Sequence, residues 1–326
     1  MGQAKILVIG ANSQDAYVLS EILAGTDDFL VATSLNISKS KAMHSALFPR
    51  NIVIQTAEYS TEFFVKILSD FDFKQVYIFG SISIVNDSRL SKKDYFNSTI
   101  RLVESLTEAL TLTKKINSVI VFHSSSVEMF GKDLLAEQTE STPFNPQSFY
   151  AEGKTFAHMH LKDLRDKGDC KSINGILYNH ESKYRKFDFV TQKICQGVAE
   201  IFLGKKEKIL LGNLKACREW SYANDLITAA KFGMDNELIG DYILASGTTR
   251  SLEDWIRNAF AAVSINDWEQ YVELDADLLR SGKEYSPQAN ISKASSYLNL
   301  QQTISFETLV NNMVIHRIQD GTSNAN

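Results

Sequence analysis

The stretch KILVIGANSQDAYVLSEILAG, residues 5–25, decides the fold. Its first part is an apolar run of strand length that ends in Gly10, and residues 15–25 have the apolar spacing of a helix. A strand that ends in glycine before a helix is the turn at which doubly wound folds hold a dinucleotide pyrophosphate, because free N–H groups at the helix N-terminus attract negative charge. The stretch therefore predicts the first unit of an α/β fold.

Apolar runs and helical patterns continue to alternate beyond this stretch. Continuous Val, Ile, Leu and Phe runs are typical of strands buried on both faces, and their alternation with helices predicts a parallel sheet with right-handed crossovers. We therefore expect an α/β protein with a Rossmann-type doubly wound parallel sheet over residues 1–180 and a smaller C-terminal α+β lobe over 181–326. Further strands are predicted at 29–35, 75–81, 118–126, 174–180 and 241–246, the last returning to the sheet, and helices at 62–71, 101–115 and 189–204.

Composition narrows the class of protein. The chain has 326 residues, of which 44% are hydrophobic, and this length suits one large domain or two joined ones. A net charge of −5 argues against nucleic acid or an anionic membrane as a partner. The cysteines are odd in number and lack metal-ligand spacing, and no apolar run approaches the roughly 20 residues that span a bilayer. With no secretory signal, we expect a soluble cytoplasmic protein without a metal site.

The turn after the first strand carries a weak form of the dinucleotide fingerprint. Only Gly10 of the usual glycines remains, and Ser13 and Ala16 are small replacements. The turn alone therefore fits a structural role as well as cofactor binding. After the second strand an acidic residue would favour NAD and an arginine NADP, but the sequence has Asn36. The segment that follows it, residues 38–41, could meet a 2′-phosphate through Ser38, Lys39 and Lys41 or form a solvated loop.

A second group of polar residues follows the strand at 118–126. Ser126 and Glu128 come at its carboxyl end, where ligands bind in open α/β sheets. Tyr150 and Lys154 follow in a predicted helix, and side chains at this spacing share a helix face. A Tyr-x-x-x-Lys pair is also common on ordinary helix surfaces, so spacing alone does not decide its role.

Three motifs farther along the chain are more specific. They are NGILYNHES (174–182), FVTQKI (189–194) and LGNLKACREWSYANDLI (211–227). Together with the preceding Ser, Glu, Tyr and Lys, they resemble the GDP-mannose 4,6-dehydratase family, in the sugar-nucleotide branch of the extended short-chain dehydrogenases/reductases. The resemblance covers nearly the whole chain. It implies a lyase that converts a nucleotide-linked hexose to its 4-keto-6-deoxy derivative, for deoxysugar and surface polysaccharide synthesis.

The chemistry of this reaction gives each catalytic residue a role. Water leaves across C5 and C6 only after C4 is oxidised, because the C5 proton then lies beside a ketone; the nicotinamide takes the hydride and later returns it to C6. The resemblance assigns the O4 proton to Tyr150, whose pKa Lys154 and the oxidised nicotinamide would lower. Ser126 would hydrogen-bond O4. Glu128 would remove the C5 proton and protonate the departing C6 hydroxyl.

The resemblance also implies binding residues, with the sugar nucleotide, expected to be GDP-linked, held by the C-terminal lobe. Arginine forks suit its phosphates. The cofactor would be NAD or, favoured, NADP, tightly held and recycled. The cofactor set is Gly10, Asn12, Ser13, Gln14, Asp15, Asn36, Gly80, Ser81, Tyr150, Lys154 and His180. The substrate set is Ser83, Asn179, Glu181, Arg185, Lys193, Arg218 and Arg280. By analogy with relatives, apolar faces of helices 101–115 and 154–166 predict a homodimer or homotetramer.

Departures from the family keep two alternatives open. Asn36 and Ile37 replace paired arginines after the second strand, and Ala57 and Glu58 replace an Asp-Leu adenine contact. In the last substrate loop Lys283 replaces a glutamate. The chain could therefore be an epimerase or 4-keto reductase on the same scaffold. It could also be a non-catalytic homologue with an eroded cofactor site.

Overall fold

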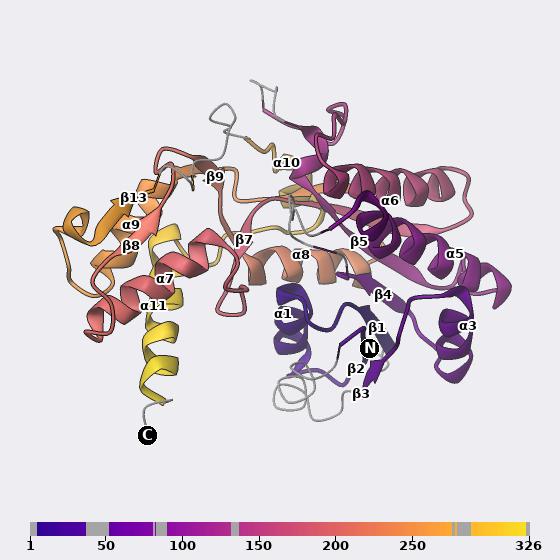
Figure 1. Cartoon of the computed structure of the whole chain (residues 1–326). Coiled ribbons are helices and arrows are strands. Elements are labelled where there is room, and N and C mark those ends of the chain that lie inside the picture. The colour runs from indigo at the N-terminus through magenta and orange to yellow at the C-terminus, as the bar shows by residue number, and fades with distance from the viewer. Residues whose placement is uncertain are drawn as a thin grey trace.

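A parallel sheet of seven strands organises the first part of the chain in the computed structural model (Figure 1). The structure describes residues 5–36, 52–80, 82, 90–131, 137–275, 278 and 288–323. The strand order is β11-β6-β5-β4-β1-β2-β3, and every neighbouring pair is parallel. The strands are β1 (Lys5–Ile9), β2 (Phe29–Ser34), β3 (Ile52–Gln55), β4 (Gln75–Ile78), β5 (Ile120–Ser126), β6 (Lys171–Leu177) and β11 (Gly240–Leu244).

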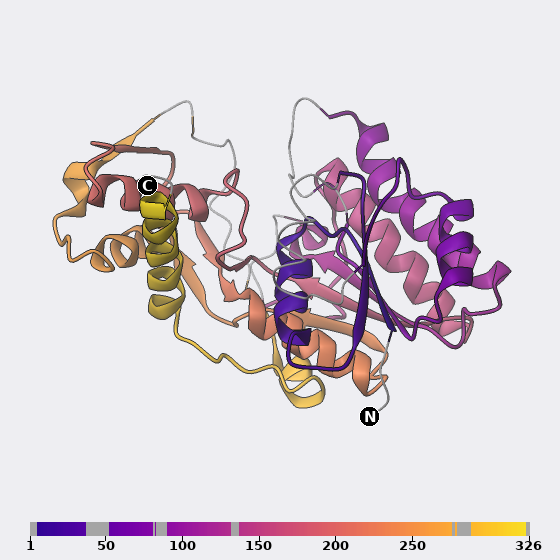
Figure 2. The same ribbon diagram turned by 90° about the horizontal axis from the view of Figure 1, so that it is seen from below.

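Helices cover both faces of this sheet, and the strand sequences explain why. In β1, Ile6 and Val8 pack into a core with helices α1 and α8, whereas Leu7 and Ile9 pack into the core beneath α3, α5 and α6. Both faces of the strand are therefore apolar. The two helical layers can be followed in Figure 2. The helices are α1 (Gln14–Leu23), α3 (Thr61–Asp70), α5 (Leu102–Leu112), α6 (Phe149–Asp166) and α8 (Ala223–Asp235).

A separate core, around Trp255, Phe260 and Met313, holds the C-terminal lobe that lies to the left in Figure 1. Its helices are α7 (Val190–Phe202), α9 (Leu252–Ala261) and α11 (Phe306–Ser323). Two-stranded sheets pair β8 (Ile209–Leu211) with β13 (Val272–Leu274), β9 (Cys217–Glu219) with β12 (Thr249–Ser251), and β7 (His180–Glu181) with β10 (Ser221–Tyr222). The remaining elements are α4 (Lys92–Phe96), the π-helical turn η1 (Asn97–Arg101), the short 3₁₀ helices η2 (Val127–Phe130) and η3 (Trp268–Tyr271), and α10 (Ser292–Tyr297).

This architecture confirms the predicted fold class, and β11, which overlaps the predicted strand 241–246 at residues 241–244, returns to the sheet. The predicted boundary at residue 180 stays a prediction. Strand β3 was not predicted. It has only four residues, and so short a run of β-branched side chains can also occur in a loop. Among the helices of the described segments, none has both the length and the apolar character to cross a membrane.

Candidate active site

A cavity of about 950 Å³ opens at the carboxyl ends of β1, β4 and β5 and extends to residues 179–189. This is the edge of an open α/β sheet at which ligands bind, and the volume is of the size of ligand pockets. Most of the predicted site residues line this one cavity. They are Gly10, Asn12, Ser13, Gln14, Asp15, Asn36, Gly80, Ser126, Glu128, Tyr150, Lys154, Asn179, His180 and Arg185.

The turn between β1 and α1 is shaped by two glycines that face each other. Gly10 has a φ of 99°, and a Cβ on it would lie 2.4 Å from the Cα of Gly80. The close approach of β1 and β4 therefore leaves no room for a side chain at Gly10. Ser13 caps α1 by accepting a hydrogen bond from the N–H of Ala16 at 3.1 Å. The first N–H groups of a helix have no partner within it, so the N-terminus of α1 can receive a diphosphate.

Asn12 ties this turn to the end of β2. Its Nδ2 donates to Ser34 Oγ at 2.8 Å and to the carbonyl of Asn36 at 2.5 Å. Its Oδ1 is buried and has no hydrogen-bond partner. Such an orphaned acceptor, beside a glycine turn and a helix N-terminus, fits the hydroxyl-rich part of a dinucleotide. The residues present thus suit the cofactor that the sequence predicts, despite the missing glycines.

Ser126, Glu128, Tyr150 and Lys154 converge at the other end of the cavity. Ser126 ends β5 and accepts a hydrogen bond from the N–H of Glu128 at 3.3 Å, which starts η2. Helix α6 starts at a Ser148 cap, so Tyr150 lies in its first turn. The half-buried Glu128 and Tyr150 line the same wall, and the Glu128 carboxylate adds to the rise that burial causes in the pKa of the Tyr150 phenol. Glu128 and Tyr150 therefore border the same cavity.

Lys154 is 3% exposed, and its ammonium lies 6.0 Å from the centroid of the Tyr150 ring. Its Nζ donates to the carbonyl of Ser124 at 2.6 Å. Burial lowers the pKa of Lys154 to about 8. Burial also raises the pKa of Tyr150 to about 12, although a hydrogen bond with Ser126 opposes the rise. In the chain by itself the phenol is therefore less acidic than usual, whereas the resemblance predicts that Lys154 and the nicotinamide lower its pKa.

His180 links the cofactor turn to the segment after β6. Its Nε2 lies 2.9 Å from Asp15 Oδ1, and its Nδ1 lies 2.7 Å from the carbonyl of Tyr178. Burial alone would lower the pKa of His180, but the Asp15 carboxylate raises it above its ordinary value. Gln14 donates to the carbonyl of His180 at 3.1 Å and accepts from Ser182 Oγ at 2.9 Å. These contacts join the turn to the residues that carry Arg185.

Arg185 is one of the described cations of the cavity wall, together with Lys186, Arg101 and Lys154. Its Nε lies 3.2 Å from Glu181 Oε2, and its guanidinium stacks 3.5 Å from the centroid of the Phe189 ring. Glu181 is 1% exposed, and burial raises its pKa although Arg185 opposes this. Stacking on Phe189 fixes the plane of the guanidinium, which can then present its remaining N–H donors to a phosphate.

Comparison with known proteins decides among the families that share this fold. The family model described as GDP-mannose 4,6 dehydratase matches residues 8–313. The chain belongs to this family. It is 30% identical over 328 residues to GDP-mannose 4,6 dehydratase 2 of Arabidopsis thaliana, an alignment that covers 94% of this chain and 85% of the relative. To the GDP-mannose 4,6 dehydratase of Homo sapiens it is 32% identical over 232 residues, which cover 66% of this chain and 61% of the relative.

A solved structure of lower identity shares the fold. The crystal structure of DesIV, a dTDP-glucose 4,6-dehydratase from Streptomyces venezuelae with NAD and TYD bound, matches with a TM-score of 0.83 at 16% identity and covers 98% of each chain. The predicted Rossmann-type sheet and the predicted membership of the GDP-mannose 4,6-dehydratase family are both confirmed.

Some predicted binding residues of this family member lie elsewhere. Lys193 is exposed on α7 and does not line the cavity. Arg218 lies in β9, where its guanidinium donates to the carbonyl of Cys217 at 2.6 Å, and it is not part of the cavity wall either. Ser81, Ser83 and Arg280 lie outside the described residues.

Other cavity residues were not predicted from the sequence. Tyr59 stacks on Phe64 and donates to the carbonyl of Thr33 at 3.1 Å, next to the glycine turn. Asn97 and Arg101 reach the cavity from η1, a π-helical turn between α4 and α5. Such turns often lie at functional sites, but one extra residue in a helical pattern leaves no mark in the amphipathic spacing. An aromatic residue in a loop after a weak strand gives equally little signal.

Proposed function

We propose that the chain is an NAD(P)-dependent sugar-nucleotide 4,6-dehydratase that converts a nucleotide-linked hexose to its 4-keto-6-deoxy derivative. The observation that carries the proposal is the convergence of Ser126, Glu128, Tyr150 and Lys154 on the cavity that begins at the glycine turn. Membership of the GDP-mannose 4,6-dehydratase family supports it. A carboxylate beside a tyrosine and a serine gives one base for O4 and a second base for C5, which elimination requires.

The first half of the reaction belongs to Tyr150. It accepts the O4 proton while Ser126 holds the O4 atom through its hydroxyl. A bound nicotinamide would supply the oxidising power, as the acceptor of hydride from C4 and its donor to C6. The pKa of about 12 makes phenolate formation costly in the chain by itself. Arg185 already lowers the pKa of Tyr150, and the ammonium of Lys154, 6.0 Å from the ring centroid, is a second protein cation that can offset this cost.

The second half belongs to Glu128. Once C4 is a ketone, the carboxylate removes the C5 proton, and the same carboxyl group gives a proton to the C6 hydroxyl as it leaves as water. One group can do both because the two events follow each other on neighbouring carbon atoms. A sugar-nucleotide epimerase or 4-keto reductase does not need this base, so Glu128 favours the dehydratase over both alternatives.

For the substrate we propose a GDP-linked sugar whose diphosphate lies along Arg185 and Asn179. Arg185 supports this because it lines the cavity, half-buried, with its guanidinium stacked on Phe189. Arg218, Lys193 and Arg280 remain proposals from the resemblance. The Arg185→Ala variant should raise the KM for the sugar nucleotide about tenfold or more, the order expected from a lost charged hydrogen bond.

For the cofactor we propose NADP, with NAD as the alternative. Ser38, Lys39 and Lys41 motivate NADP, but they lie outside the described residues. Glu58 and Glu62 on the described cavity wall oppose a 2′-phosphate by charge. The affinities for NADP and NAD, measured on protein from which the bound dinucleotide has been removed, test this. The double variant Lys39→Ala/Lys41→Ala should bind NADP more weakly and NAD as the wild type does.

We further propose a homodimer or homotetramer in the cytoplasm. Exposed apolar side chains on α5 and α6 support an interface there, among them Leu112 at 63% and Phe149 at 46% exposed. The odd number of cysteines fits a reducing compartment. Light scattering after gel filtration measures the oligomeric state, and a monomer would contradict the proposal.

The test of the function is incubation of the purified protein with GDP-mannose and other sugar nucleotides, without added reductant. We expect a product lighter by one water and a dinucleotide that remains with the protein at unchanged oxidation state. An epimer of unchanged mass would identify an epimerase, and consumption of added NADPH a reductase. A protein that neither retains nor binds a dinucleotide would be the non-catalytic homologue.

A further inference from the structure

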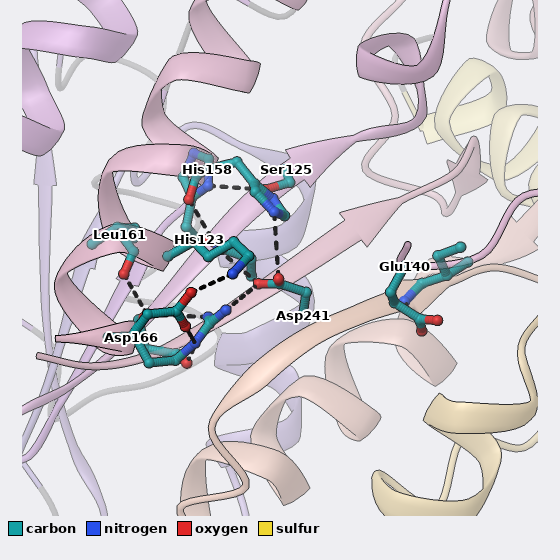
Figure 3. A network of polar contacts seen from close by, with 12 residues as sticks. His123, Ser125, Glu140, His158, Leu161, Asp166 and Asp241 are labelled. Carbon is teal, nitrogen blue, oxygen red and sulfur yellow. Dashed lines mark hydrogen bonds and ion pairs between the residues drawn. The ribbon is translucent and has the colours of Figure 1, made fainter. Parts of the chain in front are cut away.

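A buried chain of polar side chains lies behind the catalytic residues, and the reaction as proposed does not use it. His123 Nδ1 lies 3.0 Å from Ser125 Oγ, and Ser125 Oγ lies 2.9 Å from His158 Nδ1. His158 Nε2 lies 3.7 Å from Asp241 Oδ2. The chain of contacts can be followed in Figure 3, where β5, α6 and β11 each contribute a labelled residue.

The chain has a definite direction. Asp241 also accepts hydrogen bonds from Arg165 NH2 at 2.7 Å and Asn174 Nδ2 at 3.0 Å. Burial alone would raise the pKa of Asp241, but His158 and Arg165 hold it well below its ordinary value, so the carboxylate is ionised. A carboxylate facing Nε2 favours the proton on that nitrogen of His158. Nδ1 is then an acceptor for the Ser125 hydroxyl, which leaves a lone pair of Ser125 for the Nδ1–H of His123.

Ser125 is placed between two catalytic contacts. Its neighbour Ser124 supplies the carbonyl to which Lys154 donates, and its other neighbour Ser126 hydrogen-bonds Tyr150. His158 follows Lys154 at the same spacing by which Lys154 follows Tyr150, so all three side chains share one face of α6. The hydrogen bond between His158 and Ser125 therefore fixes α6 against β5. It does so next to the contacts by which Lys154 and Tyr150 on α6 meet Ser124 and Ser126 on β5.

We propose that His158 is a positioning residue, which through Ser125 holds Lys154 and Tyr150 in register with the end of β5. The inference rests on the proposed dehydratase function. An apolar side chain could fill the space beside Phe144, whose ring meets His158 edge-on at 4.9 Å. A polar side chain at this position also fixes the rotation of α6 about its axis and its position along that axis, because every buried donor must meet its acceptor.

The test compares His158→Phe and Ser125→Ala with the wild type. Each should lower kcat roughly 10- to 100-fold, the effect of a misplacement of about 1 Å, and change the KM for the sugar nucleotide less than about threefold. Both substitutions remove the same hydrogen bond, the one between His158 and Ser125. The kcat of the double variant should therefore be no lower than that of the slower single variant. His160→Phe is the control: His160 lies on the same helix but contacts Thr107 and Phe156, and its variant should keep the wild-type kcat.

A second readout needs no turnover. Lysine NMR, with the Lys154 signal assigned through Lys154→Met, should give a pKa near 8 in the wild type and a value nearer 10.5 in His158→Phe. Should His158→Phe not fold, Ser125→Ala, which removes one hydroxyl, decides by the same measurements. A wild-type kcat in the folded variants, independent effects in the double variant, or an unchanged Lys154 pKa would overturn the inference. If the wild type lacks dehydratase activity but the pKa of Lys154 still differs between the wild type and His158→Phe, only the proposed function is overturned.

Discussion

At the scale of single residues, Glu128 separates the proposed elimination from a simple oxidation at C4. In Glu128→Gln, C4 can still lose hydride, but the C5 proton stays. We expect kcat for the keto-deoxy product to fall by at least about 100-fold, the contribution of a general base, while reduced nicotinamide accumulates. Absorbance and fluorescence of the reduced cofactor measure this.

Glu152→Gln is the matched control for Glu128→Gln. Glu152 lies on α6, its side chain is 44% exposed, and its partner is Lys92 at 2.8 Å. This variant should keep the wild-type rate. Equal losses in the two variants, or no accumulation of reduced cofactor in Glu128→Gln, would contradict the role of Glu128.

Lys154 gives a prediction about stability. Its pKa is about 8 in the folded protein and 10.5 when unfolded, so the unfolded chain binds the proton more strongly between these values. The free energy of unfolding should therefore rise with pH across this window, by up to about 3 kcal/mol. Lys154→Met should lose this rise and be more stable than the wild type at pH 7, although inactive.

Urea unfolding of both proteins at pH 7 and pH 9.5 checks the Lys154 prediction. A wild-type protein whose stability does not rise relative to Lys154→Met between these two pH values would show that the ammonium is hydrated rather than buried.

At the scale of elements, the turn between β1 and α1 depends on Gly10. Gly10→Ala places a Cβ 2.4 Å from the Cα of Gly80 and forces a side chain onto a φ of 99°. We expect a loss of about 1–3 kcal/mol in the free energy of unfolding and loss of the retained dinucleotide. Gly25, at the far end of α1, has an ordinary φ and no atom within 4 Å of the position that a Cβ would take, so Gly25→Ala should change neither.

The elements also show how far the sequence could predict this molecule. The strand–glycine–helix unit was clear because β1 is buried on both faces and α1 has a serine cap. Tyr150 and Lys154 were found from spacing and family motifs together. The missed features, β3 and the π-helical turn η1, have weak local patterns and form through tertiary contacts. No local pattern could reveal that His158 meets Asp241 across β6, since these residues are distant in sequence.

At the scale of the whole molecule, residues 182–187 join the sheet to the C-terminal lobe. Tyr184 donates to Glu21 on α1 at 2.5 Å, and Lys183 pairs with Glu21 at 2.7 Å. From the other side, Arg317 on α11 donates to the carbonyl of Lys183 at 3.1 Å. Arg185 lies within this segment, so its place in the cavity depends on both lobes.

Tyr184→Phe should therefore raise the KM for the sugar nucleotide about tenfold, the order of one hydrogen bond to a charged group, and leave dinucleotide retention intact. Steady-state kinetics measure this. Tyr297→Phe, at a tyrosine that is 60% exposed, is the control and should behave as the wild type. If Tyr184→Phe loses the retained dinucleotide while its KM for the sugar nucleotide is unchanged, the segment acts on cofactor binding instead, which would contradict this prediction.

The proposed reaction requires that one hexose ring, held between Tyr150 and Glu128, gives its C4 hydride to the nicotinamide and receives it back at C6. The most direct measurement uses a sugar nucleotide that carries deuterium at C4. We expect a 4-keto-6-deoxy product, lighter by one water, with the deuterium on C6. Deuterium that stays at C4, or that leaves with a released cofactor, would contradict the proposed hydride path.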